Sequence, residues 1–97
     1  MDNLRITDNA FLRQFEAKVD DKLAKIEYST QEKKVFLTKV VIPEDITEDD
    51  FKDRFIKSVL REIDKKNLRM VPTSPDIARF LRRHKEYKEL LPVGIRI

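Results

Sequence analysis

Three side chains in the last quarter of the chain have the chemistry of catalytic groups. They are the hydroxyl of Ser74, the imidazole of His84 and the phenol of Tyr87. A serine hydroxyl becomes a nucleophile when a base lies beside it, and His84 is the only histidine. A continuous helix would hold Ser74 and His84 about 15 Å apart. We therefore expect Ser74 to cap a helix and His84 to pack at a helix end, with catalysis as the less favoured alternative.

The two tyrosines and the metal-ligating residue types give weaker signals. Tyr28 and Tyr87 could donate protons, but such tyrosines are more often packed with the hydroxyl in water.

The chain has one histidine and no cysteine, so it cannot build a zinc cluster. We therefore predict no metal site.

The stretch PEDITEDDF, residues 43–51, joins an apolar run to a helical pattern. Turns between a strand and a helix often bind phosphate through free backbone amides, and they are usually rich in glycine. This stretch has no glycine, and it carries five acidic residues: Glu44, Asp45, Glu48, Asp49 and Asp50. The same carboxylates suit a helix start, where they complement the helix dipole.

The first half of the chain has the period of β-strands. In residues 11–19 one face carries the side chains Phe11, Phe15, Ala17 and Val19. Residues 23–29 alternate again, and Asp20 and Asp21 supply turn chemistry, so the two runs predict a hairpin. Residues 35–42 are apolar on both faces, which predicts a central strand covered on both sides.

The second half switches to helical spacing. Residues 47–66 carry one apolar stripe, formed by Phe51, Phe55, Ile56, Val59, Leu60 and Ile63. We expect Thr47 to be the N-cap and Asp50 the third helical residue. Residues 68–71 predict a short buried strand, and a second helix follows Ser74. The segment KEYKELL continues that helix or opens a last short turn.

This order predicts a single α+β domain over residues 1–97. Three antiparallel strands precede a crossover helix, a fourth strand and a C-terminal helix. No apolar run reaches the roughly 20 residues that span a bilayer. The N-terminus lacks the pattern of a secretory signal. We expect a cytoplasmic protein that does not enter membranes.

The charge is distributed unevenly along the chain. Residues 1–50 hold 8 basic and 12 acidic residues, whereas residues 51–97 hold 13 basic and 6 acidic ones. Arg79, Arg82 and Arg83 share a helix face through their spacing. This face could bind a polyanion or an acidic partner, and ordinary solvated surface is the favoured interpretation.

The C-terminal sequence and the order of elements resemble the small stand-alone domains of the GNAT superfamily, the GCN5-related N-acetyltransferases. Those proteins typically carry Ile-Pro-x-Cys-Pro, a helix and an Arg/Lys-His-Pro-Glu-Tyr segment. The residues here at matching spacing are Val71, Pro72, Ser74, Pro75, His84, Glu86 and Tyr87. The resemblance implies a GNAT-like mixed sheet. It also implies acetyl-CoA as cofactor, with its thioester between the third and fourth predicted strands.

Aligned on this resemblance, the chain departs from the family at two positions, the turn at residues 47–50 and Ser74. The family's Arg-Gly-x-Gly turn, whose backbone amides hold the pyrophosphate of acetyl-CoA, falls on Thr47, Glu48, Asp49 and Asp50. Like charges about 4 Å apart cost about 1 kcal/mol in water, and the helix dipole offers roughly 0.3–1 kcal/mol. Ser74 stands where the family has a cysteine. Acetyl-CoA binding is therefore possible but disfavoured.

Two functions remain open. The favoured one is a non-catalytic binding or regulatory module that kept the scaffold, since a fold does not fix a function. The alternative is an acetyl-CoA-dependent N-acetyltransferase that transfers acetyl directly to an amine. The acceptor amine and the choice between monomer and homodimer stay open. Val93, Ile95 and Ile97 alternate as an edge strand would.

Overall fold

The computed structural model describes residues 4–47 and 50–95. Within them, five strands form one sheet in chain order. They are β1 (Thr7–Asn9), β2 (Gln14–Val19), β3 (Lys22–Gln31), β4 (Lys34–Val41) and β5 (Arg69–Pro72). The first four strands pair antiparallel, and β5 pairs parallel with β4. The predicted α+β fold with a mixed sheet is confirmed.

The strand predicted to start at Phe11 starts instead at Gln14. Residues 10–13 form a turn, in which the Leu12 N–H donates to Asn9 Oδ1 at 3.1 Å and Arg13 adopts a φ of 55°. Phe11 is therefore 94% exposed, and its predicted place in the core is wrong. The cause is β1, a short polar strand that the alternation pattern does not reveal.

The predicted hairpin is present, with Asp20 and Asp21 in its turn. A bulge interrupts the next pair of strands. Glu27 faces Lys39 and Tyr28 faces Leu37, so Thr38 is the extra residue. Its hydroxyl donates to the Glu27 carbonyl at 3.1 Å. The bulge lies where β4 leaves its pairing with β5, and a bulge typically bends and twists its strand at that point.

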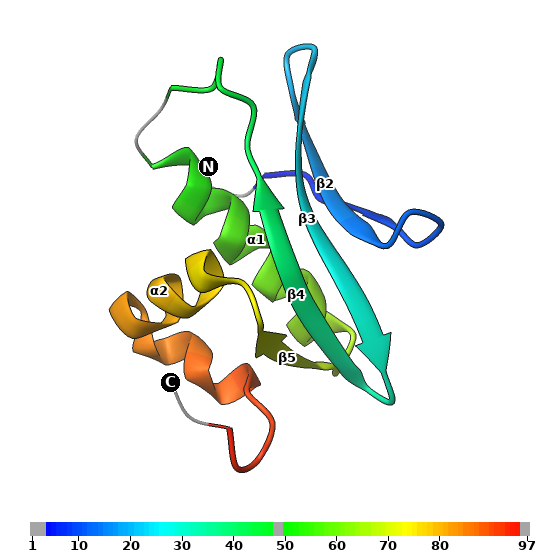
Figure 1. Cartoon of the computed structure of the whole chain (residues 1–97), viewed down its shortest axis with the longest axis vertical. Coiled ribbons are helices and arrows are strands. Elements are labelled where there is room, and N and C mark those ends of the chain that lie inside the picture. The colour runs from blue at the N-terminus through cyan, green and yellow to red at the C-terminus, as the bar shows by residue number, and fades with distance from the viewer. Residues whose placement is uncertain (1–3, 48–49, 96–97) are drawn as a thin grey trace.

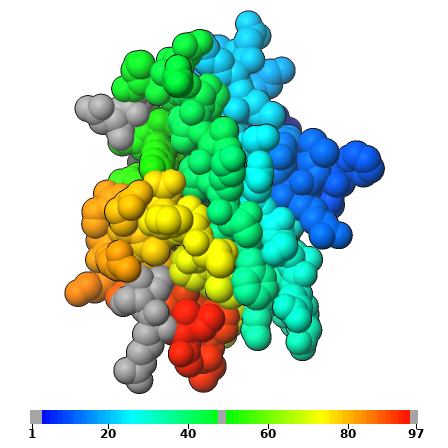
Figure 2. All heavy atoms as spheres, viewed as in Figure 1, coloured from blue at the N-terminus to red at the C-terminus, as the bar shows by residue number. Residues whose placement is uncertain are grey.

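In the part of the chain that the structure describes, helices bury one face of the sheet. That face contributes six core residues from the antiparallel strands: Phe15, Ala17, Ala24, Ile26, Val35 and Leu37. On β4, Thr38 and Lys39 are exposed and Phe36 is half-buried. Figure 2 shows the uncovered face, where β2, β3 and β4 lie side by side at the surface. The prediction that residues 35–42 are covered on both sides is therefore wrong.

Helix α1 (Phe51–Lys65) packs on the buried face through the predicted stripe, whose six members are all buried. The helix starts three residues later than predicted. A hydrogen bond from the Ile46 N–H to the Pro43 carbonyl closes a turn just before it. Asp50 is the N-cap, without a side-chain capping bond, so the placement of Thr47 as N-cap and of Asp50 inside the helix is wrong.

The chain continues through β5 into α2 (Pro75–Arg83) and a 3-10 helix, η1 (Lys85–Leu90). In Figure 1, α1 runs behind β4, and α2 with η1 lies beside the sheet. The helix breaks at His84, with φ −126° and ψ 76°. KEYKELL is thus a short turn of its own and does not continue α2. Residues 93–95 form no strand, Val93 is fully exposed, and Ile97 lies outside the described residues.

Candidate functional site

The starts of α1 and α2 are joined by an ion pair. Lys52 Nζ lies 2.5 Å from Asp76 Oδ1, and Arg79 Nη2 lies 2.8 Å from the same oxygen. The hydrogen bond from Lys52, with that from Arg79, holds the pKa of Asp76 below its usual range. These two helix starts flank the place that the resemblance assigns to the cofactor.

Strands β4 and β5 part beside these helix starts. Their pairing ends at Leu37 and Pro72, and the Leu37 carbonyl then accepts from the Thr73 hydroxyl at 3.0 Å and the Ser74 N–H at 2.8 Å. β4 runs on to Val41. Over the described residues, this last part of β4 has no strand partner on that side.

Ser74 is the N-cap of α2, as expected. Its hydroxyl accepts from the Asp76 N–H at 3.2 Å, and the residue is only 2% exposed. His84 lies at the other end of the helix, where its ring stacks on Phe80 at 4.4 Å between centroids. The structure therefore does not bring the only histidine to the serine hydroxyl.

His84 instead lies in a cluster of polar side chains with Arg83 and Asp53 of α1. Arg83 donates two 3.0 Å hydrogen bonds to the two carboxylate oxygens of Asp53. His84 Nε2 lies 3.9 Å from Asp53 Oδ2. The Arg83 hydrogen bond is the main cause that lowers the pKa of Asp53. The cluster ties the end of α2 to the first turn of α1.

The two tyrosines lie in separate places. Tyr87 is half-buried against Phe80, with ring centroids 5.6 Å apart. Tyr28 donates its hydroxyl hydrogen to Asp8, and burial followed by this hydrogen bond raises its pKa to about 12. A phenol with so high a pKa stays protonated at neutral pH. Neither tyrosine makes a hydrogen bond to Ser74.

The turn predicted to face phosphate is only partly described, since Glu48 and Asp49 lie outside the described residues. Thr47 is exposed. The Asp50 carboxylate is 71% exposed and lies 4.0 Å from Arg54 Nη1. The single glycine of the chain, Gly94, is far along the sequence from this turn.

The predicted basic face is partly neutralised. Arg79 pairs with Asp76 and Arg83 pairs with Asp53. Arg82 is exposed and forms no ion pair with any residue that the structure describes. One of the three arginines is thus left to attract an anion.

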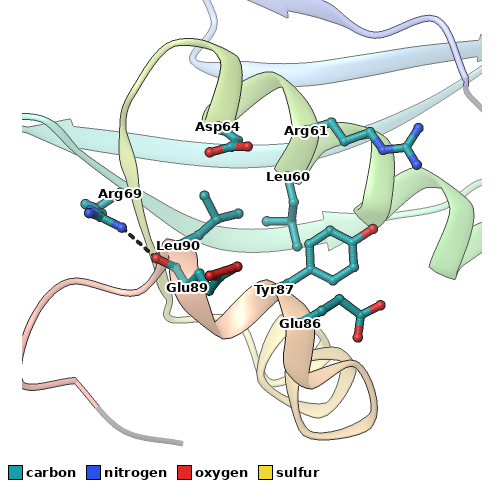
Figure 3. Close-up of a pocket in the computed structure, with 8 residues that line it drawn as sticks. All are labelled: Leu60, Arg61, Asp64, Arg69, Glu86, Tyr87, Glu89 and Leu90. Atoms are coloured by element: carbon teal, nitrogen blue, oxygen red, sulfur yellow. Dashed lines mark hydrogen bonds between the residues drawn. The ribbon is translucent and has the colours of Figure 1, made fainter.

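A groove between α1 and η1 was not predicted from the sequence. Two hollows of about 390 and 490 Å³ share Arg61, Glu86 and Tyr87 in their lining, so they are adjacent. Figure 3 shows Leu60 on α1 pointing toward Tyr87 on η1, while Arg61 and Asp64 extend from α1 to either side of Leu60. The helix break at His84 places η1 beside α1, and the sequence left open whether KEYKELL breaks from α2 or continues it.

Among residues 4–47 and 50–95, no three His, Asp or Glu side chains form a group that could hold a metal ion. No helix in the same residues has the length and apolar character needed to cross a membrane.

Comparisons with known proteins agree with the fold. Among solved structures, the chain is similar to a GCN5-like candidate N-acetyltransferase from Staphylococcus aureus, determined by NMR. The TM-score is 0.69 at 17% identity, and the match covers 99% of this chain and 94% of the other. Such low identity shows the fold alone. No curated protein sequence matches the chain.

The family assignment comes from the sequence model of the GCN5-related N-acetyl-transferases. That model matches residues 14–90, from the start of β2 to the end of η1. The match spans most of the chain and includes every element that positions the site. This protein therefore belongs to the GCN5-related N-acetyltransferase family.

Proposed function

We propose that this family member is a non-catalytic binding or regulatory module, with weak or lost binding of acetyl-CoA. One observation carries the proposal. The cations at the start of α1 already face carboxylates, because Lys52 pairs with Asp76 and Arg54 lies beside Asp50. A pyrophosphate placed there would compete with carboxylates for both cations.

The charge of the turn adds to this competition. The sequence puts acidic residues at Glu48 and Asp49 as well as at Asp50. Each like-charge approach at about 4 Å costs about 1 kcal/mol in water and more in a drier site. The helix dipole stabilises an anion at the helix start by roughly 0.3–1 kcal/mol. Repulsion therefore exceeds the attraction that a helix start usually offers to phosphate.

The candidate catalytic side chains support the same proposal. The Ser74 hydroxyl is buried and occupied by capping. His84 lies at the opposite end of α2. Activation of a serine needs an adjacent base. The only histidine, His84, is too far from Ser74 to be that base.

The alternative function is acetyl-CoA-dependent N-acetyl transfer to an amine. It is favoured by the parting of β4 and β5 after Leu37 and Pro72. The backbone of Thr38–Val41 could there hydrogen-bond the amide groups of a CoA arm. Direct transfer would need no serine nucleophile.

A thermal-shift comparison tests the proposed function. The native chain should show no rise in melting temperature with acetyl-CoA, whereas the double variant Glu48→Gly with Asp50→Gly should gain one. Ligand at a hundredfold excess over its Kd stabilises by about 2.7 kcal/mol. The double variant Glu48→Gln with Asp50→Asn removes the charges and keeps the side chains, so it separates charge from bulk. A rise of several degrees for the native chain would overturn the proposal.

A further inference from the structure

The 3-10 helix η1 lies beside α1 over space that is incompletely filled. Two adjacent hollows of about 390 and 490 Å³ lie between the two helices. In Figure 3, η1 passes alongside α1, and Leu60 of α1 points toward Tyr87 across this space. Protein interiors are normally close-packed, and atoms that line a void lose contacts on that side. The contact between η1 and α1 is therefore weaker than the packing of α1 on the sheet.

The hydrogen bonds within η1 hold its backbone only weakly. The Tyr87 N–H donates to the His84 carbonyl at 3.2 Å, and the Leu91 N–H donates to the Lys88 carbonyl at 3.1 Å. Bonds of this 3-10 type have poorer geometry than those of an α-helix. Residues 85 and 86 are exposed, so the first part of η1 buries little surface. A segment with few buried apolar contacts opens locally at a lower free energy than the rest of a fold.

The two ends of η1 are attached in different ways. At its start, the backbone of His84 leaves the helical conformation of α2, while its N–H still donates to the Phe80 carbonyl at 2.9 Å and its ring stacks on Phe80. At the end of η1, Leu90 is buried, and the Glu89 carbonyl accepts from Arg69 Nη1 at 2.6 Å. His84 thus has the place of a hinge. Arg69 has the place of a clip that ties η1 to β5.

Helix α2 is tied to α1 at both of its ends. Asp76 at its start pairs with Lys52, and Arg83 at its end pairs with Asp53. Its apolar side chains are fully buried, and they are Ile77, Phe80 and Leu81. We therefore expect α2 to stay in place when η1 moves.

We propose that η1 is a hinged strap over the space between it and α1. The strap pivots at His84, and it opens when Arg69 releases the Glu89 carbonyl. Opening moves Leu90 out of the core and exposes Leu60 of α1, so the strap controls access to the space beneath it. This device goes beyond the proposed function, because it requires neither acetyl-CoA nor a partner.

Native-state hydrogen exchange of the 15N-labelled full chain tests the strap. The reporters are the amides of Tyr87 and Leu91, whose hydrogen bonds lie at the two ends of η1. The reference amides are those of Phe80 and Leu81 in α2, whose side chains are fully buried. In the native chain, the reporters should be protected at least about tenfold less than the reference amides, which corresponds to about 1.4 kcal/mol.

The variant Arg69→Ala removes the clip. Arg69 is exposed, so its truncation leaves no cavity. Exchange at Tyr87 and Leu91 should rise at least about tenfold, again about 1.4 kcal/mol, and exchange in α2 should not change. Arg82→Ala removes another exposed arginine, on α2, and should change neither. Equal protection of η1 and α2 in the native chain, unchanged exchange in Arg69→Ala, or an equal rise in α2 would overturn the inference.

Thiol labelling gives a second measurement, because the chain has no cysteine. Leu60→Cys places a thiol beneath the strap. Ile63→Cys places one on the same helix at a position that is also fully buried but does not line the space. Adding Arg69→Ala should speed the alkylation of Leu60→Cys by iodoacetamide about tenfold, through more frequent local opening, and should leave Ile63→Cys unchanged. Acceleration of both thiols alike, or of neither, would show that no strap opens.

Discussion

Ser74 shows how one side chain can match a family position and serve a different purpose. Its hydroxyl accepts from the Asp76 N–H and is shielded from solvent. Ser74→Ala should therefore lower the free energy of unfolding by about 1 kcal/mol, the usual cost of a lost N-cap. Urea denaturation measures this. Ser29→Ala, at an exposed position on β3, is the control and should change stability by less than about 0.5 kcal/mol. Equal effects of the two would contradict the capping role.

Asp53 predicts a pH dependence of stability. Its folded-state pKa is lowered, chiefly by the hydrogen bond from Arg83. A group with a depressed folded pKa stabilises the fold fully above its unfolded pKa, about 3.9 for Asp. That stabilisation is lost as the pH falls through the lowered folded value. The native chain should therefore be more stable than Asp53→Asn at neutral pH, and the difference should shrink below the unfolded pKa.

Melting temperatures of both chains across that range measure the effect. A difference that stays constant from neutral pH to strongly acidic pH would contradict the role of the Asp53 carboxylate.

At the scale of elements, the period of apolar residues predicted which side chains face the core. It did not predict where elements begin or which other elements cover them. The stripe on α1 was predictable because each member faces one sheet. The start of α1 was not, because an acidic stretch suits both a turn and a first helical turn. Residues 35–42 are apolar on both faces. Whether both faces are buried depends on whether another element packs on each of them, and the sequence pattern does not show this. The groove between α1 and η1 depends on the break at His84, and the sequence left open whether residues 85–91 continue the helix or form a turn of their own.

Two phenylalanines give a direct test of the element boundaries. Phe55 is fully buried on α1 and Phe11 is 94% exposed in the turn between β1 and β2. Phe55→Ala should cost about 3–5 kcal/mol of unfolding free energy, as usual for a buried aromatic. Phe11→Ala should change it by less than about 0.5 kcal/mol. Denaturant unfolding of both variants measures this, and a large cost at Phe11 would show that the predicted longer strand exists in solution.

At the scale of the whole molecule, the excess positive charge of residues 51–97 is partly neutralised by ion pairs, most of them within that half. Lys66 pairs with Asp8, Arg83 with Asp53, and Lys52 and Arg79 with Asp76. The basic half therefore offers fewer free cations than its composition suggests. Residue counts could not reveal this, because only the fold sets which charges meet.

This predicts weak binding to nucleic acid. A fluorescent single-stranded oligonucleotide should bind weakly at low salt and not measurably at physiological ionic strength, since few phosphates would be neutralised. Arg82→Ala should remove most of the remaining binding, because Arg82 is the arginine of that face without an ion pair in the described residues. Fluorescence anisotropy at several salt concentrations measures this. Tight binding with a steep salt slope would instead support a polyanion partner.

We propose that the GNAT scaffold persists here without a working site for acetyl-CoA. The most direct measurement is calorimetric titration of the native chain with acetyl-CoA, at concentrations that would reveal a micromolar Kd. We expect no saturable heat, because the phosphates would meet Glu48, Asp49 and Asp50 and would compete with Asp76 for Lys52. Micromolar binding, with phosphates on the backbone amides of residues 47–50 in a co-crystal, would contradict the claim and favour the enzyme.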